Sequence, residues 1–122
     1  TRPAATSAVS ASLEQAGTDT AHVVDVTSGM AGVALVGPRA RDVLAAGTEL
    51  DVAPGSLGNA ACAQSAFARV RGTLLRIVLG ELPAYELYFD RSYGEYMWEA
   101  LLTAMSDGWP VPIGVEAMDL LR

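Results

Sequence analysis

The sequence contains no lysine: all eight basic residues are arginines, against fourteen acidic residues and one histidine. Without a lysine amine the chain cannot form a Schiff base, the usual pyridoxal-phosphate site or a phosphate-loop lysine contact. The formal net charge is −6. Because nucleic-acid binding depends on neutralising phosphates with a basic surface, this balance argues against a nucleic-acid partner.

Cysteine, histidine and long apolar runs are equally scarce. The single cysteine, Cys62, excludes an intramolecular disulfide and a zinc site built on several thiolates, and the single His22 excludes a histidine cluster. No apolar run approaches the ~18–20 residues that span a bilayer. No charged and then apolar leader follows Thr1. We therefore expect a cytoplasmic protein without membrane contact.

The chain does have enough apolar surface for one folded domain. It has 122 residues, of which 51% are hydrophobic. Neither half could bury enough apolar surface alone, so we predict one domain over residues 22–122. Residues 1–21 are small and polar, which predicts a flexible arm, or one bound to a partner, with a short helical turn around Ser12–Ala16.

Short apolar stretches predict the strands. The β-branched residues at 23–26 and the almost wholly apolar run at 31–36 indicate two strands. Gly72 and the residues at 80–83 separate three further strand candidates, which are Ala63–Arg71, Thr73–Leu79 and Tyr85–Phe89.

The last of these strands has two different faces. Leu87 and Phe89 share one face with Tyr85, whereas Glu86, Tyr88 and Asp90 share the other. This alternation is typical of an antiparallel strand that is buried on one side only. We interpret Glu86 as part of the solvated face.

Turn and capping residues predict the helices. Gly37-Pro38 opens a short helix over 39–46, and a capping box from Ser92 to Glu95 opens a longer helix over 93–106. The buried stripe of that helix is expected at Tyr93, Met97, Leu101 and Met105. A final helix spans 115–121. The order of elements predicts an α+β fold in which an antiparallel sheet is covered by two or three helices.

No group of residues by itself indicates catalysis. Carboxylates cluster around the last strand and could divide acid and base roles, but solvated or capping positions explain them more simply. These carboxylates are Glu81, Glu86, Asp90, Glu95 and Glu99. From the residues alone the chain is an α+β domain without a self-contained catalytic apparatus.

Five segments carry sequence motifs in a fixed order. These are Val24–Thr27, the strand, Gly-Pro and helix unit at 33–44, Gly80-Glu81-Leu82 followed by Tyr85–Tyr88, Met97–Leu102, and Gly114–Arg122. Together they resemble the folate-binding aminomethyltransferase superfamily, which includes the glycine cleavage T-protein. The segments at 48–52 and 60–64 are most similar to the gamma subunit of heterotetrameric sarcosine oxidase.

The resemblance implies a folate site. A carboxylate at Glu81 would accept the amide N–H and the amine on one edge of a pterin. Tyr85 or Tyr88 would supply a stacking face, and Arg122 would pair with the glutamate tail or an internal acid. One departure is that Pro83-Ala84-Tyr85 stands where the family has Gly-Tyr. Another is that residues 64–77 contain no Asp or Glu, whereas complete transferases place an acid there.

The resemblance also implies a function for the chain as one part of an assembly. It would be a small subunit of a hetero-oligomeric, folate-linked one-carbon enzyme, and would shape the tetrahydrofolate site or the subunit interface. A larger partner subunit would hold the flavin that oxidises an N-methyl substrate. The alternative is a non-catalytic structural subunit with a degenerate folate-binding fold. A free-standing transferase is disfavoured because the acid at 64–77 is missing.

Overall fold

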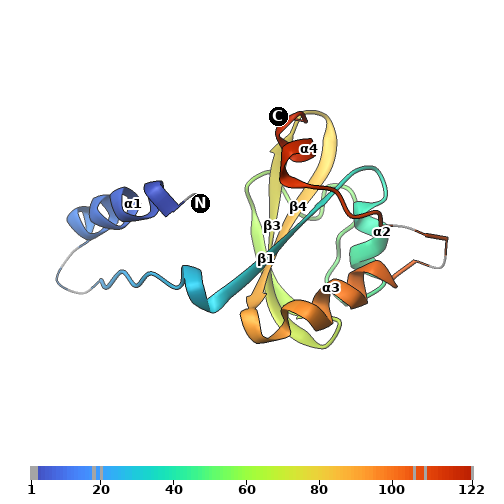
Figure 1. Cartoon of the computed structure of the whole chain (residues 1–122), viewed down its shortest axis with the longest axis horizontal. Helices are drawn as coiled ribbons and strands as arrows, with labels where there is room; N and C mark the ends of the chain where they lie inside the picture. The colour runs from blue at the N-terminus through green and yellow to red at the C-terminus, as the bar shows by residue number, and fades with distance from the viewer. Residues whose placement is uncertain (1–2, 18, 20, 106, 109, 122) are drawn as a thin grey trace.

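Four antiparallel strands form one sheet in the order β1-β4-β3-β2 (Figure 1). The computed structural model describes residues 3–17, 19, 21–105, 107–108 and 110–121. Along the chain the elements are α1 (Pro3–Ala16), the 3-10 turn η1 (Thr27–Gly29), β1 (Met30–Val36), α2 (Ala40–Ala45), β2 (Cys62–Phe67), β3 (Val70–Leu79), β4 (Leu82–Asp90), η2 (Arg91–Tyr93), α3 (Gly94–Leu102) and α4 (Val115–Asp119). The α+β fold is therefore confirmed.

Strand β4 lies inside the sheet and carries the centre of the core. It pairs with β1 on one side and with β3 on the other. As predicted, Tyr85, Leu87 and Phe89 are buried together, whereas Glu86 and Tyr88 are only partly buried. Helices α2 and α3 cover the buried face, at the right in Figure 1. The residues that they contribute to the core are Ala40, Val43, Leu44, Met97 and Leu101.

The β2–β3 turn lies at a different place from the one predicted. Ala68 and Arg69 form the turn with φ values of 46° and 70°, and Gly72 lies inside β3. A β-carbon at Gly72 would lie 3.0 Å from the backbone oxygen of Tyr88 and 3.1 Å from a methyl carbon of Leu87. The glycine therefore marks close packing within the sheet, and the reading of it as a break between strands was wrong.

The predicted strand at 23–26 does not form. Residues 21–26 have no regular secondary structure and pair with no strand, and Val24 is 73% exposed. Valine favours strands only where a neighbouring strand supplies hydrogen bonds and packing, and this segment has none beside it. A single strand, β1, therefore precedes α2.

Helix α3 is shorter than predicted and begins differently. Asp90 takes the capping role: its carboxylate accepts from the backbone N–H of Ser92 at 2.8 Å and from the Ser92 hydroxyl at 2.6 Å. These bonds, the hydroxyl bond most of all, hold the pKa of Asp90 below its ordinary value. The expected Ser92–Glu95 capping box is not formed.

The buried stripe of α3 is also shorter than predicted. Tyr93 falls in η2 and is 48% exposed, so it does not belong to the buried stripe. Met97 and Leu101 do, and Ser106 lies outside the described residues.

Helix α1 stands apart from the sheet, at the left in Figure 1. It spans 14 residues and is therefore much longer than the helical turn expected around Ser12–Ala16. The idea that this arm binds a partner stays a prediction. None of the helices in the described part of the chain is long and apolar enough to cross a membrane.

Substitutions in the α3 stripe test this packing. Met97 is 1% exposed, so Met97→Asp buries an unpaired carboxylate and should lower the free energy of unfolding by several kcal/mol, about 3 or more. Tyr93→Asp introduces the same charge four residues earlier, at an exposed position, and should change it by about 0.5 kcal/mol or less. Urea denaturation monitored by circular dichroism measures both. Equal effects of the two substitutions would contradict the observed packing of α3.

Candidate functional site

The open face of the sheet carries a tyrosine paired with a carboxylate. The hydroxyl of Tyr88 donates to Oε2 of Glu86 at 2.7 Å. Residues two apart on one strand point to the same face, so the alternation of β4 places this pair on the side away from α2 and α3. The second carboxylate oxygen of Glu86, Oε1, has no hydrogen-bond partner among the described residues. It remains able to accept from a ligand.

The ring of Tyr88 lies directly over Gly32 of β1. These two residues are partners in the β1–β4 ladder, and a β-carbon at Gly32 would lie 2.9 Å from the ring atom Cε1 and 3.1 Å from Cδ1. Only glycine leaves room for the ring to lie this close to the strand. Tyr88 and Gly32 therefore present an aromatic ring on the sheet, next to the carboxylate of Glu86.

The Tyr88 hydroxyl is held in its neutral form. Its pKa is raised from an ordinary value of 10.0 to about 12, chiefly because the phenol proton is bonded to Glu86, and also because of burial and the nearby negative charge. The neutral phenol is the form stabilised in the folded state. The stabilisation is therefore fully present below pH ~10 and is lost as the pH rises through about 12.

The neighbouring strand supplies a mixed surface around this pair. Thr73 and Leu75 of β3 are the ladder partners of Tyr88 and Glu86. The side-chain amide of Gln64 on β2 donates to the Thr73 hydroxyl at 3.3 Å. A planar heterocycle could stack on this face and direct an N–H group to Glu86, which is the chemistry the arrangement offers.

The structure does not bring Glu81, Tyr85 and Tyr88, three of the four predicted site residues, together. Glu81 is exposed in the Gly80-Glu81 turn between β3 and β4, seven residues from Tyr88, or roughly 23 Å along the strand. Tyr85 points to the opposite face, where it is 1% exposed and lies under the guanidinium of Arg41, 6.0 Å from the ring centre. Arg122 lies outside the described residues. A role in folate binding stays a prediction for all four.

Sequence reasoning overlooked Glu86 and Gly32. Glu86 was interpreted as solvated, although its i, i+2 spacing from Tyr88 places both side chains on one face. That spacing was the available signal. Gly32 gave none, because its contact with Tyr88 depends on the β1–β4 register, which is a long-range property.

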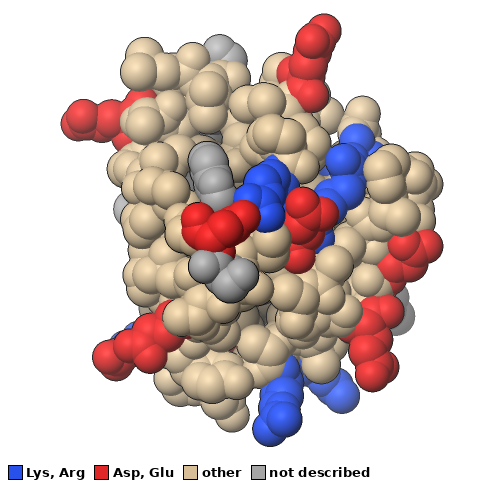
Figure 2. Space-filling model, turned by 90° about the vertical axis from the view of Figure 1, so that its right-hand side faces the viewer, with Lys and Arg blue, Asp and Glu red and all other residues tan. Residues whose placement is uncertain are grey.

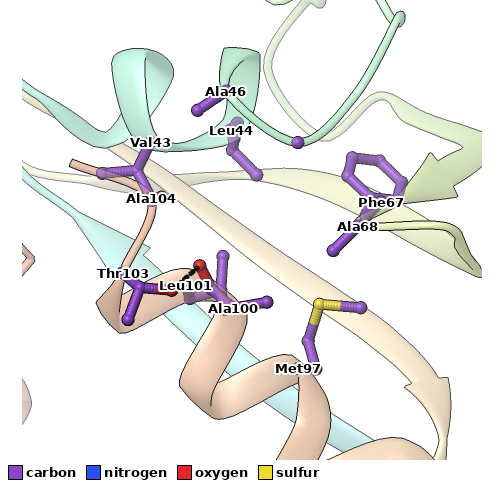
Figure 3. A pocket seen from close by; sticks show the side chains of 11 residues that line it. Val43, Leu44, Ala46, Phe67, Ala68, Met97, Ala100, Leu101, Thr103 and Ala104 are labelled. Carbon is purple, nitrogen blue, oxygen red and sulfur yellow. Dashed lines mark hydrogen bonds between the residues drawn. The ribbon is translucent and has the colours of Figure 1, made fainter.

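Two hollows lie near the sheet. A groove of about 800 Å³ runs along β1, between that strand, α2, Trp98 of α3 and the segment 110–119. A smaller gap of about 290 Å³ lies between α2 and α3 (Figure 3). Its lining side chains are apolar except for Thr103, whose hydroxyl donates to the Glu99 carbonyl at 2.8 Å and to the Ala100 carbonyl at 3.4 Å. Because this one polar side chain is already bonded within the chain, we assign the gap to helix packing.

On the helical side, one arginine pairs with two carboxylates. Arg39, at the start of α2, pairs with Asp107 at 2.6 Å and with Asp42 at 3.7 Å. Figure 2 shows basic and acidic side chains next to each other at the centre of this side, with uncharged residues over most of it. In the described part of the chain, no group of three or more His, Cys, Asp or Glu side chains could hold a metal ion.

Comparison with protein families matches residues 1–122 to the GCVT N-terminal domain, and the chain belongs to this family. It is 31% identical over 103 residues to sarcosine oxidase subunit alpha of Rhizobium meliloti, covering 83% of this chain and 10% of that protein. It is 32% identical over 101 residues to the aminomethyltransferase of Moorella thermoacetica, covering 83% of this chain and 27% of that protein. The chain thus spans only a small part of both relatives.

A solved structure has the same fold. A chain of the heterotetrameric sarcosine oxidase from Corynebacterium sp. U-96, solved in complex with pyrrole 2-carboxylate, superposes with a TM-score of 0.73 at 24% identity. The match covers 88% of this chain and 54% of that one. The expected membership of the aminomethyltransferase superfamily, and the expected relation to sarcosine oxidase subunits, are confirmed.

The Tyr88–Glu86 bond predicts a late-titrating tyrosine. In an absorbance titration, the difference between the wild-type protein and Tyr88→Phe should show one phenol that ionises near pH 12. Glu86→Gln replaces the carboxylate by a weaker, neutral acceptor, so the same phenol should ionise at a lower pH, toward 10. An unchanged midpoint in Glu86→Gln would contradict the hydrogen bond.

The contact at Gly32 predicts a second, independent effect on the same phenol. Gly32→Ala adds a methyl group 2.9 Å from the Tyr88 ring, so the ring must shift and its bond to Glu86 should weaken. The pKa of Tyr88 should again move toward its ordinary value. Gly29→Ala is the control, because a β-carbon there has no heavy atom within 4 Å. A Tyr88 pKa that stays near 12 in Gly32→Ala would contradict the close ring contact.

Proposed function

We propose that this domain is part of a multi-subunit, folate-linked one-carbon enzyme, in which it supplies one wall of the tetrahydrofolate site. The reaction would be oxidative N-demethylation, or transfer of an aminomethyl or methylene group to tetrahydrofolate. The observation that carries the proposal is the Glu86–Tyr88 pair over Gly32, on the open face of a domain of the GCVT family. Both curated relatives bear names from this chemistry.

The residues on the open face fit one edge of a pterin. A pterin is flat and presents an amide N–H and an exocyclic amine side by side. Oε1 of Glu86 is able to accept one of them, and the ring of Tyr88 lies within reach for stacking. When bound, tetrahydrofolate supplies the nitrogen that receives the one-carbon unit. The part that we propose for this chain is to bind and orient the pterin.

Glu81 is the second candidate for a carboxylate contact. It lies at the exposed turn next to the end of α4, since the backbone oxygen of Leu121 is 4.0 Å from the β-carbon position of Gly80. A ligand that extended from the open face toward this turn would meet it. Contacts from Tyr85 and Arg122 are implied by the family resemblance alone. Tyr85 is buried in the core beneath Arg41, so it would have to become exposed before it could touch a ligand.

The proposed subunit role rests on two properties of the chain. Residues 64–77, the β2–β3 hairpin, contain no acidic side chain that could handle the proton of a reacting nitrogen. The Glu86–Tyr88 pair lies on the open face of the sheet, so a second chain or domain would have to enclose a ligand bound there. A larger flavin- or folate-binding subunit in a cytoplasmic hetero-oligomer would provide both, and flavin would be bound only there.

A structural role is the second candidate function. Large apolar side chains are exposed along the β1 groove, among them Trp98, Val111 and Ile113. Such a surface is typical of one that packs against another protein. In this alternative the domain has a degenerate folate-binding fold and binds a partner chain without a ligand.

Folate affinity of the assembled protein separates the two functions. Glu86→Gln puts an N–H group where a carboxylate oxygen accepts, which removes a charge-assisted bond worth on the order of 2–3 kcal/mol. Calorimetric titration with tetrahydrofolate should then show an affinity roughly 30- to 150-fold lower. Glu95→Gln is the matched control. Glu95 lies in the first turn of α3, beyond the end of β4, and its substitution should leave the affinity unchanged.

Glu81→Gln completes the experiment. Loss of affinity in this variant with none in Glu86→Gln would move the pterin edge to the β3–β4 turn. Unchanged affinity in both variants would contradict a folate contact by this chain and leave the structural role.

A further inference from the structure

One segment of the chain has the composition of a strand but pairs with nothing. Residues 21–26 contain three valines, and Val24 and Val26 are 73% and 60% exposed. By the two-residue alternation of an extended chain these two valines share one face, and Val23 lies on the other. Within residues 21–26 the one acidic residue is Asp25, whose carboxylate already accepts from the backbone N–H of Thr27 at 2.8 Å. Apart from the Val26 carbonyl, which accepts from the Gly29 N–H, no backbone hydrogen bond of this segment is formed within the described part of the chain.

An unused pairing site lies on the same chain. Strand β1 is at one edge of the sheet, and its far side faces no other strand. The N–H of Gly37 donates to Pro83 of β4 at 2.9 Å, so the antiparallel alternation turns the N–H groups of Gly32, Ala34 and Val36 outward. No backbone hydrogen bond crosses this edge within the described part of the chain. An open edge of this kind is a template for an added strand.

The groove beside this edge suits apolar side chains. It runs along β1 from Gly32 to Val36 and is bounded by Trp98 and by the segment 110–113, which is Pro-Val-Pro-Ile. Among the described residues that line it, the one basic side chain is Arg39, which is already paired with Asp107 and Asp42, and the one acidic side chain is Asp119. Two valines on one face of an added strand would thus meet an apolar wall while their backbone pairs with β1.

The chain geometry directs the segment away from its own edge. Only the turn η1 separates residues 21–26 from β1, and this turn is closed by a bond from the Gly29 N–H to the Val26 carbonyl at 2.9 Å. Figure 1 shows the segment continuing outward from η1, away from the sheet, to α1. Folding back onto β1 of the same chain would require this turn to open and reverse.

We propose that two copies of the chain exchange these segments, so that residues 21–26 of each copy pair with the β1 edge of the other. The exchange is reciprocal, as a two-fold interface requires, and it adds a fifth strand to each sheet. It also carries α1, with its exposed Val9 and Leu13, onto the second copy. This self-association does not rest on the proposed folate role, since it uses the outward backbone groups of β1 and not the side chains of Glu86 and Tyr88.

Sedimentation velocity of the full chain tests the exchange. The wild-type protein should sediment as a dimer, and Val24→Asp should raise the dimer dissociation constant by on the order of 100-fold or more, because it places two charges in two apolar grooves. Ala34→Pro should do the same from the other side by removing an outward N–H, a change that edge strands tolerate. Val78→Asp is the matched control: Val78 is a 66% exposed valine of β3, and its variant should remain a dimer.

Each other outcome would overturn the proposal. If the wild-type protein sediments as a monomer at every loading concentration, the exchange does not occur. This holds also if hydrogen exchange shows that residues 23–26 of that monomer are protected, because they would then pair within one chain. A dimer that persists in both Val24→Asp and Ala34→Pro would place the interface elsewhere. Circular dichroism confirms folding of each variant, and Ala34→Lys replaces Ala34→Pro if the proline prevents folding.

Discussion

The alternation of side chains along β4 is the constraint on which the rest of the structure depends. One face of this inner strand places Tyr85, Leu87 and Phe89 against α2 and α3, and these side chains are almost completely buried. The other face carries Glu86 and Tyr88. Because the strand has a period of two, a slip of one residue would expose the core and bury the carboxylate. Burial of the core therefore fixes the position of the candidate site.

The pairing register adds a second constraint on the same strand. Gly32 and Thr73 are the cross-strand partners of Tyr88, and the absence of a side chain at Gly32 lets the ring lie flat on β1. In that position the hydroxyl reaches Glu86, and the bond raises the pKa of the phenol to about 12. A neutral tyrosine bonded to a carboxylate is thus produced by ordinary sheet packing.

Local patterns in the sequence were sufficient to predict the α+β class, the helix after Gly37-Pro38 and the two faces of β4. They failed where distant residues decide the outcome. The turn at Ala68–Arg69 has no glycine, and the valines at 23–26 lack a neighbouring strand. The candidate site was only half predicted for the same reason. Tyr88 was identified, whereas the role of Gly32 depends on a strand more than fifty residues away in the sequence.

The central claim is that the outward face of β4 is the ligand surface of this domain. The most direct measurement is the amide chemical-shift map of the ¹⁵N-labelled chain within the assembled protein during titration with tetrahydrofolate. The account predicts shifts at Glu86 and Tyr88 and at Gly32 and Thr73 on the flanking strands, with smaller shifts at the inward-facing Leu87. Shifts confined to the β1 groove or to the gap between α2 and α3, or no shifts at all, would contradict it.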